Sequence, residues 1–119
     1  MNLGRKYPFI IVFLLGLIAS PLHAQKNTQQ MDPELTWLTA MDLWNKEKYA
    51  TAQKHFLQIQ NFYGKGYHQR KADAHFYAAN CALKLYNKDA EFRFRRFLEL
   101  YPEDPRGDQV YFLLGEYNY

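Results

Sequence analysis

The sequence predicts an all-α fold made of antiparallel helix pairs that repeat along the chain. From residue 33 onward, apolar residues recur at steps of three and four, and no segment shows the alternation typical of a strand. Short polar, Gly- or Pro-containing breaks divide this region into five segments. Residues 72–84 also align with residues 107–119 at an offset of 35. Short loops between successive helices place them side by side and antiparallel.

The first 24 residues have the layout of a secretory signal peptide. Arg5 and Lys6 supply a positive start, residues 9–19 form an apolar run, and a signal peptidase would cut between Ala24 and Gln25. An uncleaved membrane anchor is the alternative, but the run ends at a proline before it reaches the about 20 residues that a spanning helix needs. No cysteine lies near the cleavage point, which argues against lipid attachment by the usual route.

Removal of residues 1–24 leaves 95 residues, enough for one small domain. This mature part carries 13 basic and 12 acidic side chains, so it lacks the basic excess of a nucleic-acid-binding protein. Cys81 is the single cysteine, which excludes an intrachain disulfide and a multi-cysteine metal site.

After a flexible lead-in at residues 25–31, the pair Asp32-Pro33 predicts a helix start, with aspartate as the N-cap and proline in the first turn. A second helix is expected from Tyr49 to Tyr63, closed by Gly64 and Gly66. The expected apolar stripe of the first helix comprises Leu35, Trp37, Leu38, Ala40, Met41 and Trp44. That of the second comprises Ala52, Phe56, Ile59 and Tyr63.

A third helix is expected over residues 68–85, a fourth over 89–101 and a fifth from 106 to the end. Asp104-Pro105 repeats the Asp-Pro start. The three arginines of the fourth helix do not indicate a nucleic-acid surface, because Arg95 lies between Glu91 and Glu99 at four-residue steps on a solvated face. Its apolar face comprises Ala90, Phe94, Phe97, Leu98 and Tyr101, with Phe92 alone on the opposite side.

Two sequence features resemble the tetratricopeptide repeat (TPR). "KYATAQKHF" has the Tyr-Ala-Phe spacing of the second TPR helix, and "LWNK" (43–46) returns as "LYNK" (85–88) at the end of a first helix. The period near 35 is close to the TPR length of about 34. Departures are a long first unit, a second unit that lacks the alanine at the tight crossing, and a single Leu-Gly at 114–115.

The stretch "FLELYPEDPRGDQVYFLLGEYNY" is similar to the Tyr-Pro-x-x-Pro junction of TPR proteins of the Gram-negative cell envelope, such as the Tol-Pal-associated and outer-membrane assembly TPR proteins. The resemblance covers most of residues 33–119 and implies a right-handed solenoid of about two and a half repeats. It also implies a place in the periplasm or on the periplasmic face of the outer membrane, and binding to other envelope proteins or peptides without catalysis.

No residue set predicts an active site, a cofactor or a small-molecule substrate. His68 and His75 are seven residues apart, too far for the i, i+4 pair of a helical metal site. "GKG" at 64–66 lacks the other glycines of a phosphate loop, and Cys81 has no evident base partner. Asp73 near a helix start favours the helix dipole.

The mature part carries 18 aromatic residues, which either fill an aromatic-rich core or line an inner groove. The TPR resemblance implies that the groove is lined by the first helix of each pair. In that register the groove-facing residues are Tyr77, Cys81, Lys84, Phe112 and Glu116, with Trp37 at the border. Such residues would hold an extended or helical peptide, with Lys84 available for a carboxylate.

Two function classes follow: an envelope scaffold that binds other proteins, or a helical accessory module of a cell-wall or outer-membrane assembly system whose chemistry lies in another domain or partner. The last segment, "VYFLLGEYNY", is apolar on nearly all sides. We therefore expect either further repeats after Tyr119 or self-association through this helix.

Overall fold

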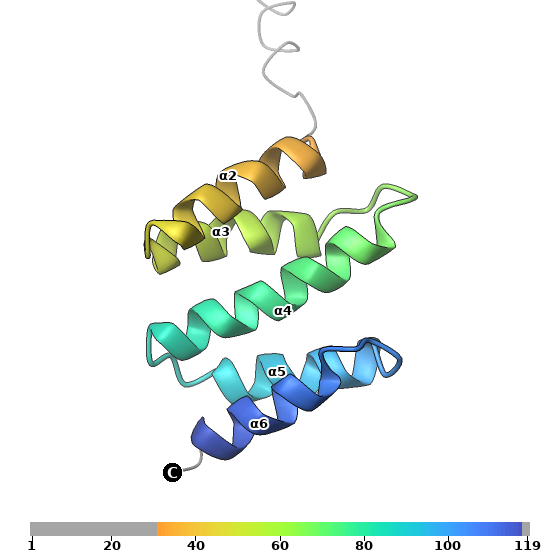
Figure 1. The fold of residues 1–119 in the computed structure, drawn as a ribbon. Helices are drawn as coiled ribbons and strands as arrows, with labels where there is room; N and C mark the ends of the chain where they lie inside the picture. The colour runs from red at the N-terminus through yellow and green to blue at the C-terminus, as the bar shows by residue number, and fades with distance from the viewer. Residues whose placement is uncertain (1–30, 118–119) are drawn as a thin grey trace, which may run out of the picture. The chain divides into compact units, whose positions relative to one another are not determined.

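The computed structural model describes residues 31–117, so the signal segment, the cleavage residues Ala24 and Gln25, most of the lead-in and Tyr119 lie outside the described residues. The described part is helical, with no strand between residues 31 and 117. Figure 1 shows its helices running back and forth in sequence order, each antiparallel to the one before. They are α2 (Pro33–Asn45), α3 (Tyr49–Gln60), α4 (His68–Lys84), α5 (Ala90–Leu100) and α6 (Gly107–Tyr117). The predicted all-α class is confirmed.

The start of α2 follows from its Asp-Pro pair. The Asp32 carboxylate accepts hydrogen bonds from the backbone N–H groups of Glu34 (2.9 Å) and Leu35 (3.5 Å), which the helix itself leaves unpaired. Pro33 occupies the first turn and is buried. The predicted capping role of Asp32 is confirmed.

Both helix pairs turn at a residue with positive φ. Glu47 (φ 59°) and Tyr86 (φ 56°) follow the ends of α2 and α4. In each turn the next N–H reaches back to a carbonyl five residues earlier, from Lys48 to Leu43 and from Asn87 to Ala82, both at 2.9 Å. These are matching Schellman turns. They place Glu47 and Tyr86 at equivalent positions, so the "LWNK" and "LYNK" segments are three residues out of structural register.

A first core cluster joins α2, α3 and α4. Its fully buried members are Ala40, Ala52, Phe56, Ile59, Ala74, Ala78 and Cys81. Rings of Trp37, Trp44 and Tyr49 pack against it. The alanines let the helices approach closely, and the aromatic rings fill the space between them.

A second cluster joins α4, α5 and α6. Its members are Phe76, Ala79, Phe94, Phe97, Val110 and Leu114. On α5 the buried side is the predicted one, whereas Phe92 is exposed. The charged side of α5 carries ion pairs Asp89–Arg93 (2.7 Å), Glu91–Arg95 (2.8 Å) and Arg96–Glu99 (3.3 Å). The arginines of this helix are thus paired with carboxylates of the same segment, as the solvated-face interpretation predicts.

Helices α3 and α5 are equivalent members of successive pairs. A shift of 38 places Ala52 on Ala90, and all of Ala52, Phe56, Ile59, Ala90, Phe94 and Phe97 are fully buried. The sequence-based statement that the second unit lacks the alanine was wrong, because Ala90 fills that position. Ala52 follows the positive-φ residue Glu47 by five positions, whereas Ala90 follows Tyr86 by four, and this difference hides the match in a fixed-period alignment.

A shift of 36 residues, rather than 35, aligns α6 with α4. On α4 the side facing the preceding pair carries Ala74, Tyr77 and Ala78. Residues 36 positions later, Val110, Leu113 and Leu114, are those that pack α6 on the preceding pair. The alignment of Phe76 with Tyr111 is therefore corrected, and Phe112 is the structural equivalent of Phe76.

Three expectations about helices α2 and α3 were wrong. Leu35 and Leu38 are largely exposed instead of joining the stripe of α2. Helix α3 ends at Gln60, so Tyr63 lies in the following loop and is 99% exposed. Gly64 and Gly66 belong to this loop rather than to the helix cap: a Cβ at Gly64 would overlap the Phe62 ring, and Gly66 has a φ of 91°.

Candidate partner-binding surfaces

A chain of ion pairs links the N-terminal ends of α2 and α4 to the loop before α6. Arg70 donates to both Glu34 oxygens, at 3.1 and 2.9 Å, and lies 3.2 Å from Asp73. Arg106 contacts Asp73 at 2.9 Å and Asp104 at 2.9 Å. The hydrogen bonds from Arg70 lower the pKa of Glu34, and those from Arg106 lower the pKa of Asp104. These carboxylates are therefore ionised and engaged at neutral pH.

Each of the two arginines also covers an aromatic ring. The Arg70 guanidinium lies 4.4 Å from the ring centroid of Trp37, and that of Arg106 lies 4.9 Å from the centroid of Phe76. Trp37 and Phe76 occupy equivalent positions of α2 and α4. The same contact, made of an acidic residue, an arginine and an aromatic ring, thus occurs between α2 and α4 and again between α4 and the start of α6. The sequence alone did not indicate this motif.

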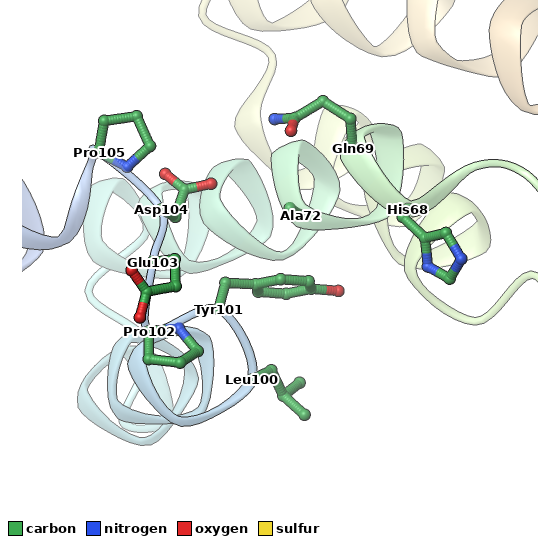
Figure 2. Close-up of a pocket in the computed structure, with 9 residues that line it drawn as sticks. All are labelled: His68, Gln69, Ala72, Leu100, Tyr101, Pro102, Glu103, Asp104 and Pro105. Carbon is green, nitrogen blue, oxygen red and sulfur yellow. The ribbon is translucent and has the colours of Figure 1, made fainter.

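A pocket of about 390 Å³ lies between the first half of α4 and the loop after α5. Figure 2 shows the Tyr101 ring pointing into it between Ala72 and Leu100, with the acidic side chains of the loop at the other end. Burial and the nearby charge of Asp104 raise the pKa of Tyr101. The remaining lining residues are His68, Gln69, Pro102, Glu103, Asp104 and Pro105. The lining thus combines apolar side chains with one histidine, one tyrosine and two carboxylates.

His75 lies beside this pocket, on α4. Its ring is 5.4 Å from that of Tyr101. Burial lowers its pKa to about 4, and the charges of Arg96, Arg93 and Lys71 act in the same direction. The imidazole is therefore neutral at pH 7 and functions as a packing group. Between residues 31 and 117 there is no group of three His, Cys, Asp or Glu side chains arranged to hold a metal ion.

Two of the residues predicted for a groove, Trp37 and Tyr77, come together in the first core cluster. Tyr77 is half-buried, stacks on Phe56 at 5.3 Å and meets the edges of Trp37 (5.6 Å), Trp44 (5.2 Å) and Phe76 (5.5 Å). Through these contacts both side chains pack against the first core cluster.

Of the other predicted groove residues, Lys84, Phe112 and Glu116 lie outside this cluster, whereas Cys81 belongs to it. Lys84, Phe112 and Glu116 are exposed. Cys81 is fully buried, and burial raises its pKa to about 12, so it does not face a groove. It is also unsuited to act as a nucleophile.

The exposed side of α6 is an apolar surface that the structure adds. Tyr111 and Phe112 are each 66% exposed, and Gly115 is one turn further along. The sequence analysis named Phe112 but not Tyr111, because the 35-residue alignment placed Tyr111 on the buried Phe76. The spacing of the buried residues Val110 and Leu114 would have identified the exposed side.

The fold defines an all-α protein built from repeated helix pairs. The chain belongs to the YfiO family, described as outer membrane lipoproteins, whose match covers residues 29–119. The resemblance to TPR proteins of the cell envelope is confirmed at this level. Neither the curated proteins nor the solved structures contain a significant match.

Family membership indicates an envelope protein with a role in protein interaction. The single cysteine of the sequence, Cys81, is buried in the core cluster of α2, α3 and α4. Among the described helices, none is long and apolar enough to cross a membrane.

Proposed function

We propose that this protein is a scaffold at the periplasmic face of the outer membrane that holds other envelope proteins and catalyses no reaction itself. The observation that carries the proposal is the exposed aromatic pair Tyr111 and Phe112 on α6. On α4 the equivalent face is covered by the following helix, so a face of this kind is suited to pack against another helix. The envelope family supports the compartment.

Export by cleavage between Ala24 and Gln25 is part of the proposal, supported by the charged, apolar and small-residue segments in order. N-terminal sequencing of the protein from an envelope fraction should begin at Gln25. Recovery of the chain with Met1 in a cytoplasmic fraction would contradict it.

The scaffold role is tested by site-specific photocrosslinking in intact cells. A photoreactive phenylalanine analogue at position 112 should yield a discrete crosslinked envelope protein, identifiable by mass spectrometry. The matched control is position 92, an exposed phenylalanine on a different helix (69% exposed). Equal crosslinking from both positions, or none from 112, would contradict a partner surface on α6.

A further inference from the structure

The pocket between α4 and the loop after α5 has an apolar side and an acidic end. Ala72, Leu100 and the Tyr101 ring form the apolar side. Glu103 and Asp104 lie at the end formed by the loop (Figure 2). The volume of about 390 Å³ is near the lower limit of ligand pockets, which is about 300 Å³. The pocket is therefore suited to one long side chain with an apolar stem and a polar end.

The side chains at the acidic end accept hydrogen bonds and offer no donor. Pro102 and Pro105, which flank the two carboxylates, have no backbone N–H. Asp104 already accepts hydrogen bonds from Arg106, at 2.9 Å to each of its oxygens. Within residues 31–117, no hydrogen bond or ion pair engages the Glu103 carboxylate. A ligand group at this end must therefore donate hydrogen bonds, and a positive charge favours it.

The other cations in this region do not neutralise Glu103. Lys71, Arg93 and Arg96 influence the pKa of His75 beside the pocket, but none of the three lines it. Both of these arginines are paired with carboxylates of the α5 segment. Among the described residues, Glu103 is thus the carboxylate of the pocket that has no cation in contact.

The protein combines an arginine, a carboxylate and an aromatic ring twice within its own fold. The guanidinium of Arg70 lies 4.4 Å from the ring centroid of Trp37, and that of Arg106 lies 4.9 Å from the centroid of Phe76. Each of these arginines is also paired with a carboxylate at 2.9 Å. The pocket offers a ring and an unpaired carboxylate, but it contains no arginine of its own.

The arginines of the described chain are already engaged. Between residues 31 and 117 each of them forms an ion pair with a carboxylate: Arg70, Arg93, Arg95, Arg96 and Arg106. Arg5 precedes the expected cleavage position and would be removed on export. An arginine that fills the pocket therefore comes from outside this set.

A further helix pair would not cover the pocket. The loop after α3 is followed by the whole second pair, yet Tyr63 in this loop is 99% exposed and Lys65 is exposed as well. The pairs stack on the sides of helices and leave the connecting loops at the edge of the stack (Figure 1). The loop after α5 would stay open in the same way. The loop after α3 has no acidic residue, so it does not offer the same site.

Resting on the proposed scaffold function, we propose that this pocket binds one arginine side chain of a partner protein. The aliphatic stem of that arginine packs along Tyr101, and its guanidinium pairs with Glu103 at the acidic end. Lysine fits less well, because an ammonium group cannot form the two parallel hydrogen bonds that a guanidinium makes with a carboxylate.

The test is a titration of the isotope-labelled protein, purified after export, with acetyl-arginine amide, followed by NMR. We expect saturable shift changes at Gln69, Tyr101 and Glu103. The citrulline analogue has a similar shape but no charge, and it should bind at least about tenfold more weakly. Glu103→Gln should weaken arginine binding by a similar factor. The matched control is Glu116→Gln, which removes an exposed carboxylate of α6 outside the pocket and should bind like the wild type.

Equal binding of arginine and citrulline, or binding unchanged by Glu103→Gln, would overturn the proposal. Absence of arginine binding to the wild type would also overturn it, including the case in which a residue after Tyr119 in a longer polypeptide already fills the pocket.

A photoreactive residue at position 68, which lines the pocket, separates this proposal from the scaffold function in intact cells. It should crosslink to an envelope protein, and Glu103→Gln should reduce the yield. Crosslinks from position 112 but none from position 68 would reject the pocket and leave the scaffold function intact. Arginine binding without crosslinks from either position would instead reject the scaffold function and leave a site for arginine.

Discussion

The carboxylate of Asp73 lies between two guanidinium groups. One of its oxygens is 3.2 Å from Nη1 of Arg70, and the other is 2.9 Å from Nη1 of Arg106. The Asp73 side chain is 15% exposed, so water screens these pairs less than it screens an ordinary surface pair. Arg70 also forms an ion pair with Glu34, and Arg106 forms one with Asp104. Asp73 therefore links the ion pairs between α2 and α4 to those of the loop before α6.

Substitution of Asp73 by alanine should lower the free energy of unfolding by about 1–2 kcal/mol, the usual contribution of hydrogen bonds to charged groups in a partly exposed site. For a domain of this size the Tm should fall by roughly 5–10 °C. Thermal unfolding followed by circular dichroism measures both.

The matched control is Asp42→Ala, which removes the exposed ion pair with Lys46 (2.9 Å). Its cost should stay below about 0.5 kcal/mol, because exposed pairs contribute little. Equal losses in the two variants would show that Asp73 acts as one more surface charge.

Glycine at the two positive-φ positions should stabilise the protein. A non-glycine residue in this conformation destabilises the folded state by about 1–2 kcal/mol. The greater freedom of glycine in the unfolded chain offsets about 0.5–1 kcal/mol of the gain from replacing it. Glu47→Gly and Tyr86→Gly should each therefore raise the free energy of unfolding by up to about 1 kcal/mol, measured by urea denaturation. Lys46→Gly is the control, since Lys46 has an ordinary φ of −86° and should gain nothing. A loss of stability in Glu47→Gly would contradict the strain argument.

Stability should fall as the pH decreases from 7 to 5, in part through His75. The pKa of His75 is lowered from 6.5 to about 4 by burial and by Arg96, Arg93 and Lys71, so the unfolded chain takes up the proton first. The contribution of neutral His75 to the free energy of unfolding is complete above pH 6.5. It is lost as the pH falls from 6.5 toward 4, and it amounts to about 1–3 kcal/mol in total.

His75→Gln should flatten the dependence of the urea midpoint on pH between 7 and 5. The lowered pKa values of Glu34 and Asp104 act below this window, so they do not obscure the comparison. His68→Gln, at an exposed position on the same helix, is measured in parallel as a control for the loss of a histidine. An unchanged slope in His75→Gln would show that His75 does not titrate differently in the two states.

The local signals in the sequence were sufficient to predict most helix positions. Asp32-Pro33 marks the start of α2 because the cap and the proline act within one turn. The turns at Glu47 and Tyr86 could not be located as easily, because the position that usually holds glycine carries a charged residue and an aromatic residue. Tertiary packing overrides local preference there.

The candidate site was harder to predict, because it depends on register and on distant pairs. An offset of 35 aligns Asp73 with Asp108 and looks convincing, but loop lengths differ between units, and packing places α6 at 36. The pair of Arg70 with Glu34 joins residues 36 apart, which no local pattern reveals. Whether Tyr77 faces a groove or the core also depends on what α2 and α3 place around it.

The last prediction separates packing from binding among the predicted groove residues. Tyr77 meets four other aromatic rings at 5.2–5.6 Å, whereas Phe112 is 66% exposed. Tyr77→Ala should therefore lower the free energy of unfolding by about 2–4 kcal/mol, as large-to-small changes in a core do. Phe112→Ala should change it by less than about 0.5 kcal/mol, as surface substitutions do.

Chemical unfolding of both variants, together with in-cell crosslinking from Tyr111, gives the required comparison. Phe112→Ala should remain folded and lose the crosslinked partner, because the ring contributes to the exposed face and not to the core. Tyr77→Phe serves as the control, because it keeps the ring contacts and should stay within about 1 kcal/mol of the wild type. If Tyr77→Ala is as stable as the wild type, Tyr77 is not part of the core and a groove on the first helices is favoured after all. If Phe112→Ala unfolds the chain, α6 is held through this ring, and the partner surface must be sought elsewhere on the molecule.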